Sequence, residues 1–419
     1  MALNYVWILF FVIGLLIALV KLIVFQDYDI FRKIVEGIFD ASKSSVMDIA
    51  LPLTGVMVFF MGLMNIGEKA GAIHLLARWL NPFMKRLFPE VPDRHPAMGQ
   101  MVMNFSANML GLDNAATPFG LKAMESLQTL NPNKETASNA QIMFLVLHTS
   151  GLTLIPLSII AYRAGAGSTN PTGVFVPLMI ATVTATIASI IVTAIYQRLR
   201  FDWVMIAWLS SLIGGVLLFA YFIYHLPSVK DAPNAGLMTK ETFSNVLGNL
   251  ILFLVICTFI IGAWIRKVHV FDAFIEGAQQ GWQVIIKIIP YLVGIIVGIR
   301  VFRESGGMDA LIQGISWVLL QLGISNEFVP SLPVAIMRPF SGGGGRGLML
   351  DVFKNYGVDS FLGNLASIFQ GSADSTFYII ALYFGSVGIK KVRYAIWAGL
   401  LADLIGVISA IFIAYLFFK

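Results

Sequence analysis

The stretch Asn104-Phe105-Ser106-Ala107-Asn108 lies inside an apolar region of the first half, and Pro339-Phe340-Ser341-Gly342-Gly343 lies inside a similar region of the second half. Each stretch places polar or glycine-rich chain among residues of a membrane-spanning type. Hydrophobic segments that are interrupted at corresponding positions of two halves are typical of a transporter's binding site. This faint duplication therefore decides how the rest of the sequence is interpreted.

The composition indicates the solvent of the folded chain. Of 419 residues, 58% are hydrophobic and only 12% are charged, with a mean hydropathy of +0.81. Such values are typical of a polytopic membrane protein. The net charge of +5 comes from basic residues that fall mostly at the ends of apolar segments. Because that position marks orientation in a membrane, we expect no nucleic-acid partner. The single cysteine, Cys257, excludes an intrachain disulfide.

Nine apolar runs are long enough to cross about 30 Å of hydrocarbon, so the expected fold is an all-α polytopic membrane protein with about nine transmembrane helices. The first run lacks a basic leader and a small-residue cleavage site, which favours an uncleaved first helix. The runs cover 3–25, 48–66, 139–162, 173–197, 203–225, 246–265, 282–303, 363–384 and 394–418.

Two further stretches, 97–126 and 330–355, are apolar but broken by Asn, Asp, Gly and Pro. Irregular backbone at membrane depth is tolerated only where protein or a water-filled cavity satisfies its polar groups. The sequence therefore predicts a re-entrant hairpin at each of these stretches.

The halves match at several points in the same order and at a near-constant offset, which indicates an internal repeat. Each repeat holds three spans and a hairpin, and two spans join them, so the second copy must be inverted. The matched points are Glu36-Gly37 with Glu276-Gly277, Pro52 with Pro290, Glu68-Lys69-Ala70-Gly71 with Glu304-Ser305-Gly306-Gly307, and Thr149-Ser150-Gly151-Leu152-Thr153 with Gly371-Ser372-Ala373-Asp374-Ser375. The expected domains are an N-terminal helix at 1–25, a first repeat at 26–200, two connecting helices at 201–267 and a second repeat at 268–419.

Loop charges predict the orientation of the chain. The loop at 67–95 carries five Lys or Arg residues, while its counterpart at 304–329 carries none. Basic loops face the cytoplasm, so we expect the N-terminus inside and the C-terminus outside, in the inner membrane of a bacterium. The basic residues of 26–47 do not fit this scheme. Apolar residues at helical spacing there predict a helix lying along the membrane surface.

At this point the chain resembles spore maturation proteins A and B fused end to end. The first half carries Asn104-Phe105-Ser106-Ala107-Asn108-Met109-Leu110-Gly111-Leu112-Asp113-Asn114-Ala115-Ala116-Thr117-Pro118, which is similar to protein A. The second half carries Arg338-Pro339-Phe340-Ser341-Gly342-Gly343-Gly344-Gly345-Arg346-Gly347 and Gln370-Gly371-Ser372-Ala373-Asp374-Ser375-Thr376, which are similar to protein B.

Both proteins belong to the Gate or nucleoside-recognition superfamily, which is similar to the membrane parts of concentrative nucleoside transporters and the ferrous-iron permease. This resemblance implies inverted repeats whose hairpins meet at mid-membrane, often in oligomers. It also implies an association with dehydration of the spore core, but it implies no particular transported solute.

The first hairpin supplies a set of candidate binding groups. If its helix is broken, half-helix ends and free carbonyls are offered to an ion or a polar solute. The alternative is that Asp113 or Asn114 simply caps the second half-helix. The candidates are Asn104, Ser106, Asn108, Asp113, Asn114 and Thr117.

The second hairpin suits an anion, because consecutive glycines expose backbone N–H groups beside a guanidinium. The alternative is a close-packed tip in which Arg346 pairs with an internal acid. The candidates here are Ser341, Gly342, Gly343, Gly344, Gly345 and Arg346. The Gly-Lys-Ser/Thr of a phosphate-binding P-loop is absent from this stretch.

The run that follows is read as one helix interrupted by Gln370, Ser372, Asp374 and Ser375. Small hydroxyl residues often serve only packing, whereas a buried Asp is expensive. Asp374 is expected to bind a coupling cation, carry a proton, or neutralise Arg346. The corresponding first-half candidates are His148, Ser150 and Thr153, although a lone histidine is commonly structural.

The charged candidates are not duplicated between the halves, which is the asymmetry that a polar or charged small molecule requires. Scattered histidines and the lone Cys257 argue against a metal site, and no catalytic constellation is found, so we expect neither a metal, nor an enzyme, nor any cofactor beyond a coupling ion, sodium or proton.

The first hypothesis is a permease for a small anionic or zwitterionic organic solute, working by alternating access within the lipid bilayer, with a homo-oligomer compatible with the resemblance. The alternative is a non-transporting scaffold or regulator that acts through protein partners in envelope or spore maturation.

Overall fold

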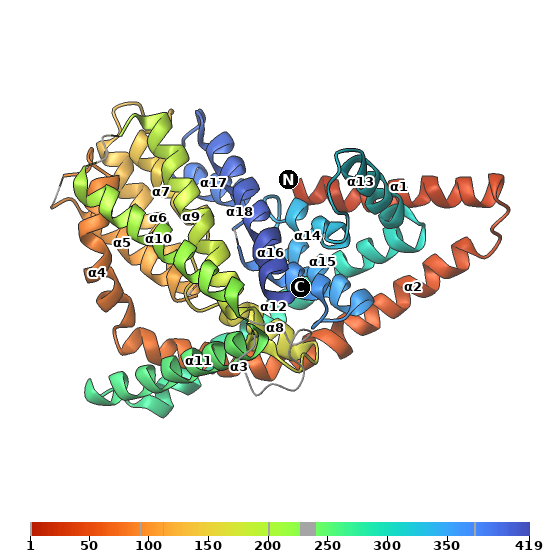
Figure 1. Ribbon diagram of the computed structural model, residues 1–419, viewed down its shortest axis with the longest axis horizontal. Helices are drawn as coiled ribbons and strands as arrows, with labels where there is room; N and C mark the ends of the chain where they lie inside the picture. The colour runs from red at the N-terminus through yellow and green to blue at the C-terminus, as the bar shows by residue number, and fades with distance from the viewer. Residues whose placement is uncertain (1, 93, 112, 200–201, 227–239, 373) are drawn as a thin grey trace.

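The computed structural model describes residues 2–92, 94–111, 113–199, 202–226, 240–372 and 374–419, with the side chains of Asp113 and Asn114 outside the described part. Every named element in these ranges is helical, which confirms the all-α prediction (Figure 1). The elements are α1 (Ala2–Val24), α2 (Ile30–Ser44), η1 (Ser45–Ala50), α3 (Leu51–Lys69), α4 (Ala72–Leu87), α5 (Pro96–Met109), α6 (Asp113–Leu130), α7 (Asn139–Thr149), α8 (Leu157–Gly165), η2 (Pro171–Val174), α9 (Phe175–Gln197), α10 (Trp203–His225), α11 (Lys240–Ile265), α12 (Val270–Glu304), α13 (Gly307–Gln321), η3 (Val329–Ser331), α14 (Leu332–Met337), α15 (Gly342–Tyr356), α16 (Phe361–Gly371), α17 (Thr376–Ser386) and α18 (Ala395–Phe418).

Two of the nine expected spans are not continuous helices. Within the described residues, seven helical runs are long and apolar enough to cross a membrane. The runs predicted at 139–162 and 363–384 are instead each divided in two, because α7 ends at Thr149 before α8, and α16 ends at Gly371 before α17. The first break contains Gly151 at φ +63°, a conformation that glycine adopts without strain. In the second break the Asp374 carboxylate accepts from the Ser375 N–H at 2.7 Å and so competes with helical bonding.

The two stretches predicted as hairpins each hold a pair of short helices. Helices α5 and α6 pack against each other, and so do α14 and α15. Gly111, at φ +71°, closes the end of α5 by donating from its N–H to the Asn108 carbonyl at 2.9 Å. The depth of these turns in a membrane stays a prediction.

The longest helical run, Ile30–Lys69, joins α2, the π-helical η1 and α3. It packs along α12 in the opposite direction: Gly37 faces Arg300, Met61 faces Gly277, and Asn65 Nδ2 donates to the Ala273 carbonyl at 2.7 Å. The helix predicted within 26–47 is therefore present as α2, but it continues into α3 instead of forming a separate surface element.

Helices α9 and α18 form a second antiparallel pair. The rings of Tyr196 and Tyr394 stack at 4.8 Å at one end of the pair, and Gly406 packs on Ala185 near its middle. In both pairs the partners hold equivalent places in the two halves. Antiparallel packing of equivalent helices is the geometry that an inverted repeat requires.

Helices α1 and α11 pack on equivalent partners. Helix α1 follows α12 in the same direction, with Trp7 Nε1 donating to the Gly294 carbonyl at 2.8 Å and Gly14 against Val301. Helix α11 follows α3 in the same direction, with Phe259 against Gly67. By packing, α11 is therefore the counterpart of α1, and α10 is the helix that connects the halves.

The two halves also contact each other through two polar turns, and each of these contacts is called a clasp below. In the first clasp, the Arg163 guanidinium donates from α8 to Asp359 Oδ1 at 2.8 Å and to the Val358 carbonyl at 3.0 Å. In the second clasp, the Lys390 and Lys391 N–H groups both donate to the Glu135 carbonyl at 2.9 Å. The α17–α18 connection lies at the upper edge of Figure 1 and α8 at the lower edge, so the clasps secure opposite edges of the molecule.

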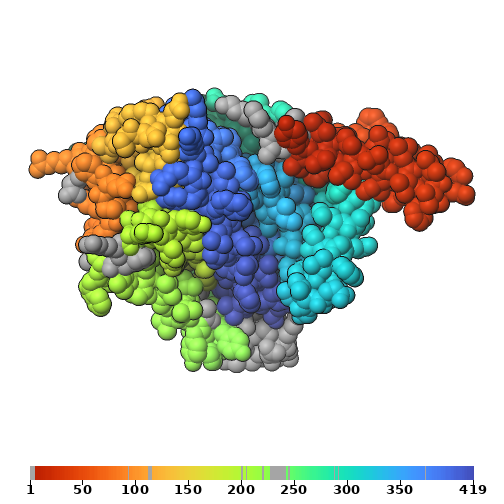
Figure 2. All heavy atoms as spheres, turned by 90° about the horizontal axis from the view of Figure 1, so that it is seen from above, coloured from red at the N-terminus to blue at the C-terminus, as the bar shows by residue number. Residues whose placement is uncertain are grey.

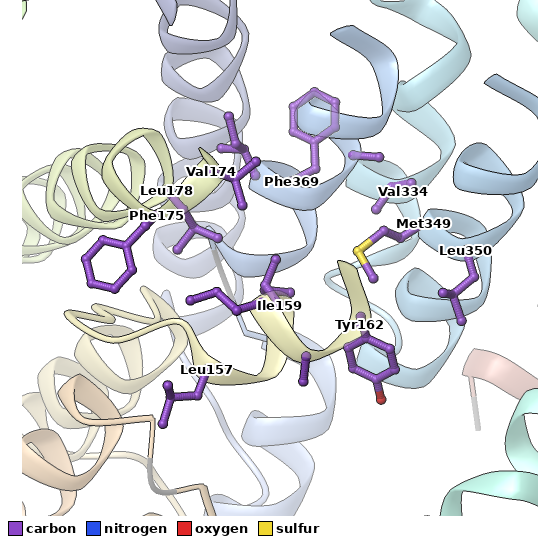
Figure 3. Packing of buried hydrophobic residues seen from close by; sticks show 14 of the residues in the cluster. Leu157, Ile159, Tyr162, Val174, Phe175, Leu178, Val334, Met349, Leu350 and Phe369 are labelled. Atoms are coloured by element: carbon purple, nitrogen blue, oxygen red, sulfur yellow. The ribbon is translucent and has the colours of Figure 1, made fainter. Parts of the chain in front are cut away.

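Apolar packing joins the halves at the centre. Figure 3 shows side chains of α8, η2 and α9 beside side chains of α14, α15 and α16. The space-filling view places blue and cyan second-half residues beside the orange to green surface of the first half, while the red N-terminal end protrudes (Figure 2). The labelled core residues are Leu157, Ile159, Tyr162, Val174, Phe175, Leu178, Val334, Met349, Leu350 and Phe369.

Candidate functional site

The hairpin turns and the broken helices meet at one place. In the first half, the Leu154 N–H donates to the Met109 carbonyl at 2.8 Å, which ties the break to the hairpin turn. In the second half, the Phe377 N–H donates to the Pro339 carbonyl at 3.0 Å in the same way. The two breaks are then linked directly, since the Asp374 N–H donates to the Thr149 carbonyl at 2.8 Å.

A cavity of about 800 Å³ opens at this junction, a size suited to a small organic ligand. Its wall includes most of the candidates from the second hairpin and from both breaks. The sequence-predicted residues that line it are Asn108, His148, Thr153, Ser341, Gly342, Gly343, Arg346, Gln370, Asp374 and Ser375.

Helix starts face the cavity. Pro156, Ser341 and Ser375 all line it, and they precede α8, α15 and α17, respectively. The first N–H groups of a helix have no partner within the helix and carry partial positive charge. The cavity therefore receives positive dipole ends from both halves.

The first-half wall is built on a buried amide and imidazole network. Asn104 Nδ2 donates to the Ala116 carbonyl at 2.7 Å, so Asn104 Oδ1 is the acceptor that faces His148 Nδ1 at 3.0 Å. His148 Nδ1 then carries the proton. Asn108 Nδ2 lies 2.8 Å from the same nitrogen, so the Asn108 amide accepts from that N–H only when it is flipped to turn its oxygen to the ring. In the neutral ring, Nε2 is left as the acceptor on the side of Asp374, 3.8 Å away.

The second-half wall carries the charges. Arg338, whose side chain is 14% exposed, places Nη1 3.2 Å from Ser375 Oγ and Nη2 3.6 Å from Asp374 Oδ1. Asp374 is the more open of the pair, with 39% of its side chain exposed. The acid of the second break thus lies beside Arg338, and neutralisation of Arg346 by Asp374 stays a prediction.

Arg346 is held by neutral groups. Its Nε donates to the Gly342 carbonyl at 3.2 Å, and Nη1 donates to the Tyr162 hydroxyl at 3.1 Å. Position 345, next to Arg346 in the chain, has room only for glycine, because a Cβ on Gly345 would lie 2.5 Å from Gln370 Oε1. The anion-binding prediction for this hairpin and its alternative, an Arg346 ion pair with an internal acid, both stay predictions.

Several candidates lie outside the cavity wall. Ser106, Ser150 and Ser372 donate to carbonyls of their own helical turns, at 2.7, 2.7 and 3.3 Å. Asn104 lies behind His148 and positions it. The prediction of one helix through the second break is wrong, because that helix is divided. Other candidates that do not line the cavity are Thr117, which is half-buried, and Gly344 and Gly345, which are buried.

The sequence reading missed Arg338 and the aromatic part of the wall. Arg338 directly precedes the decisive second-half stretch, and a cation beside a membrane hairpin was a usable signal. Phe340 and Phe377 stack with ring centroids 5.1 Å apart. The missed lining residues with rings are Tyr162, Phe340, Phe377 and Tyr378. Among the described side chains, no group of His, Cys, Asp or Glu suited to a metal is found.

This fold and site define a class: a polytopic α-helical membrane protein with two broken helices around a central polar cavity. The chain belongs to the Gate family, whose model, described as nucleoside recognition, matches residues 50–167 and 285–390. Both matched segments contain a hairpin and one broken helix.

Two relatives from Bacillus subtilis (strain 168) agree with this assignment. The chain is 42% identical over 174 residues to spore maturation protein B, a match covering 42% of this chain and 96% of that protein. It is 39% identical over 197 residues to spore maturation protein A, covering 47% of this chain and 96% of that protein. The resemblance to a fused pair is confirmed. No solved structure matches the chain.

Proposed function

We propose that the chain is a permease for a small anionic or zwitterionic organic solute that binds in the central cavity. The charge of the wall carries this proposal. Arg338 and Arg346 line the cavity together with the starts of α8, α15 and α17, and among the side chains that the structure describes the lining acid is Asp374. Buried guanidinium and backbone N–H groups favour a carboxylate or phosphate over a cation.

The remaining wall groups suit the rest of such a solute. His148, Asn108 and Gln370 offer hydrogen bonds, and Asp374 would attract an ammonium group at the end away from Arg346. Rings at Phe340 and Phe377 offer flat apolar contact. A mixture of rings, amides and arginines is compatible with the family description of nucleoside recognition, for instance with a nucleotide-like anion.

The fold supports alternating access as the mechanism. Both broken helices reach the cavity, and each half contributes equivalent parts in opposite directions, as in transporters whose repeats move around a fixed site. The loop charges support an N-terminus inside and a C-terminus outside, in the inner membrane of a bacterium.

The first experiment is thermal stability of the purified protein against nucleosides, nucleotides, amino acids, carboxylates, sodium and pH steps, because a ligand of the native state raises the melting temperature by mass action. We expect an anionic or zwitterionic hit that is lost in Arg338→Gln and Arg346→Gln. Arg32→Gln is the matched control, since Arg32 lies on the exposed surface of α2, where it pairs with Asp29.

A flat panel from well-folded protein would contradict the permease and favour the scaffold, which needs no solute. A hit that survives both arginine substitutions would place the site elsewhere.

A further inference from the structure

A buried carboxyl group lies directly behind the wall of the cavity. Asp403 of α18 is 7% exposed, and its Oδ2 accepts a hydrogen bond of 2.7 Å from Thr376 Oγ1. Thr376 is the first residue of α17 and follows Asp374 and Ser375, which line the cavity. An acidic group inside an apolar membrane helix is expensive to maintain and is usually functional.

The surroundings of Asp403 offer little to stabilise its ionised form. Small residues bring α18 close to the break, with Gly399 against Thr376 and Gly406 near the Ser372 carbonyl. Helices α9, α10, α16 and α17 contain no Asp, Glu, Lys or Arg, and α11 contains them only in its first turn. On α7, the titratable group is His148, which faces Asp374.

The charged groups that act on Asp403 are Arg338 and Asp374. The charge balance of the site therefore depends on one proton. Among the side chains that the structure describes, Arg338 and Arg346 balance Asp374 and Asp403 when Asp403 is ionised. With Asp403 protonated, the site has one net positive charge, which favours an anion. Binding of a proton and binding of an anion then strengthen each other, as linkage requires.

We propose that Asp403 is the proton-binding site that couples proton uptake to occupancy of the cavity by an anion. The proton comes from water and forms an O–H bond on the Asp403 carboxylate when the anion enters, and it returns to water when the anion leaves. The coupling rests on the proposed permease function, while the proton site itself does not.

The equivalent contact in the first half is neutral, which limits the device to one copy. There, α9 corresponds to α18, and its Thr182 Oγ1 lies 3.4 Å from the Thr153 carbonyl of the first break. Because Asp403 supplies one ionisable group, we expect about one proton to be taken up per bound monoanion.

Infrared spectroscopy of the full-length protein in lipid tests the proton site without any ligand. We expect a protonated-carboxyl band near neutral pH that disappears in Asp403→Asn and persists in Asp374→Asn. Thr376→Val keeps the carboxyl but removes its hydroxyl donor, so the band should shift in frequency. This variant also tests the proposal if Asp403→Asn does not fold. An identical band in wild type and Asp403→Asn, or no response to Thr376→Val, would overturn the proton site.

Melting temperatures with L-lactate, a monoanion, then test the coupling at about pH 6 and about pH 8. We expect lactate to stabilise wild type more at the lower pH and Asp403→Asn equally at both. The same pH dependence in Asp403→Asn as in wild type would overturn the coupling. Lactate that stabilises no variant, beside a clear infrared band, would tell against the solute class and leave the proton site supported.

Discussion

Arg338 and Asp374 set the charge of the cavity at the scale of single residues. Their closest approach is 3.6 Å, and the acid is the more exposed partner. Arg346 lines the cavity as well, so the guanidinium groups outnumber the carboxylates among the described lining side chains. Selectivity between anions and zwitterions should therefore depend on Asp374.

The first prediction concerns Asp374→Asn. Removing the carboxylate leaves Arg338 without its counter-charge, so a simple anion should bind about tenfold more tightly, equivalent to about 1.4 kcal/mol. An amino-acid zwitterion should bind more weakly, because its ammonium group loses its partner. Calorimetric titration of both ligand types measures the two changes, and parallel changes for both would contradict the assigned role.

The second prediction concerns Asn104→Ala. This substitution removes the amide donor to the Ala116 carbonyl and one of the two amides that contact His148 Nδ1, which should lower the free energy of unfolding by about 1–3 kcal/mol. Ser106→Ala in the same helix is the control, because the Ser106 hydroxyl bonds only to the Val102 carbonyl of its own helix. Equal thermal shifts for the two variants would show that the network does not position His148.

The sequence predicted which polar residues line the cavity better than it predicted which side chains contact one another. Asn108, His148, Arg346 and Asp374 were found because polar residues in an apolar run are conspicuous. Their partners were not, since pairing depends on where α16 ends. A helical projection through 363–384 assumes a continuous helix, whereas the polar residues of the second break end it at Gly371.

At the scale of elements, the breaks in α7–α8 and α16–α17 bring polar backbone to the centre. Hydropathy gave both runs as full spans, because it averages over the few polar residues that interrupt them. The long helices were predictable for the same reason: their apolar runs are unbroken. The joining of α2 to α3 through the π-helical turn Ser45–Ala50 was not, since local charge indicated a separate surface element.

The third prediction compares two glycines of α12. A Cβ on Gly277 would lie 2.5 Å from the Met61 carbonyl of α3, whereas a Cβ on Gly294 meets nothing within 4 Å. Gly277→Ala should force the antiparallel pair apart and cost about 1–3 kcal/mol. Gly294→Ala should be neutral or stabilising by about 0.5–1 kcal/mol. Melting temperatures check this, and an undisturbed Gly277→Ala would contradict the close crossing.

The fourth prediction compares the two clasps. Arg163 is 1% exposed, so Asp359→Ala leaves a buried charge without its acid and should cost about 3 kcal/mol or more. Glu135→Gln at the other clasp removes an exposed pair with Lys390, which should cost less than about 1 kcal/mol. Similar melting temperatures for both variants would contradict this difference.

The Arg163 clasp should also respond to acid. Burial opposes ionisation of the Asp359 carboxyl, but hydrogen bonds from Ser168 and Thr169 and the charge of Arg163 hold its pKa below the usual value. The stabilisation is therefore present above the usual pKa of about 4 and is lost as the pH falls through the lowered pKa. It should be complete at neutral pH.

At the scale of the whole molecule, a symmetric frame carries an asymmetric site. Two antiparallel pairs, α2–α3 with α12 and α9 with α18, each join equivalent helices of the two halves. The two clasps also join the halves, one at each edge of the molecule. The charged groups described at the cavity do not repeat: Arg338, Arg346, Asp374 and Asp403 all belong to the second half, while the side chain of the first-half candidate Asp113 lies outside the described part. The sequence indicated this asymmetry, but the position of Asp403 behind the break required the packing of α18.

The proposed permease requires the cavity at the two helix breaks to be accessible to water, and the reactivity of introduced cysteines measures that accessibility. In a Cys257→Ala background, cysteines replace Asn108 and Gly343, which line the cavity, and Ala107, which is fully buried beside Asn108. Gly343 suits this purpose better than Gly344, where a Cβ would lie 2.3 Å from the Met337 side chain.

Membrane-impermeant thiol reagents are then applied to each side of sealed vesicles. We expect Asn108→Cys and Gly343→Cys to be labelled from one side of the membrane and the solute to slow their labelling. Ala107→Cys should not be labelled. Folded protein in which all three cysteines stay unlabelled from both sides would contradict the permease.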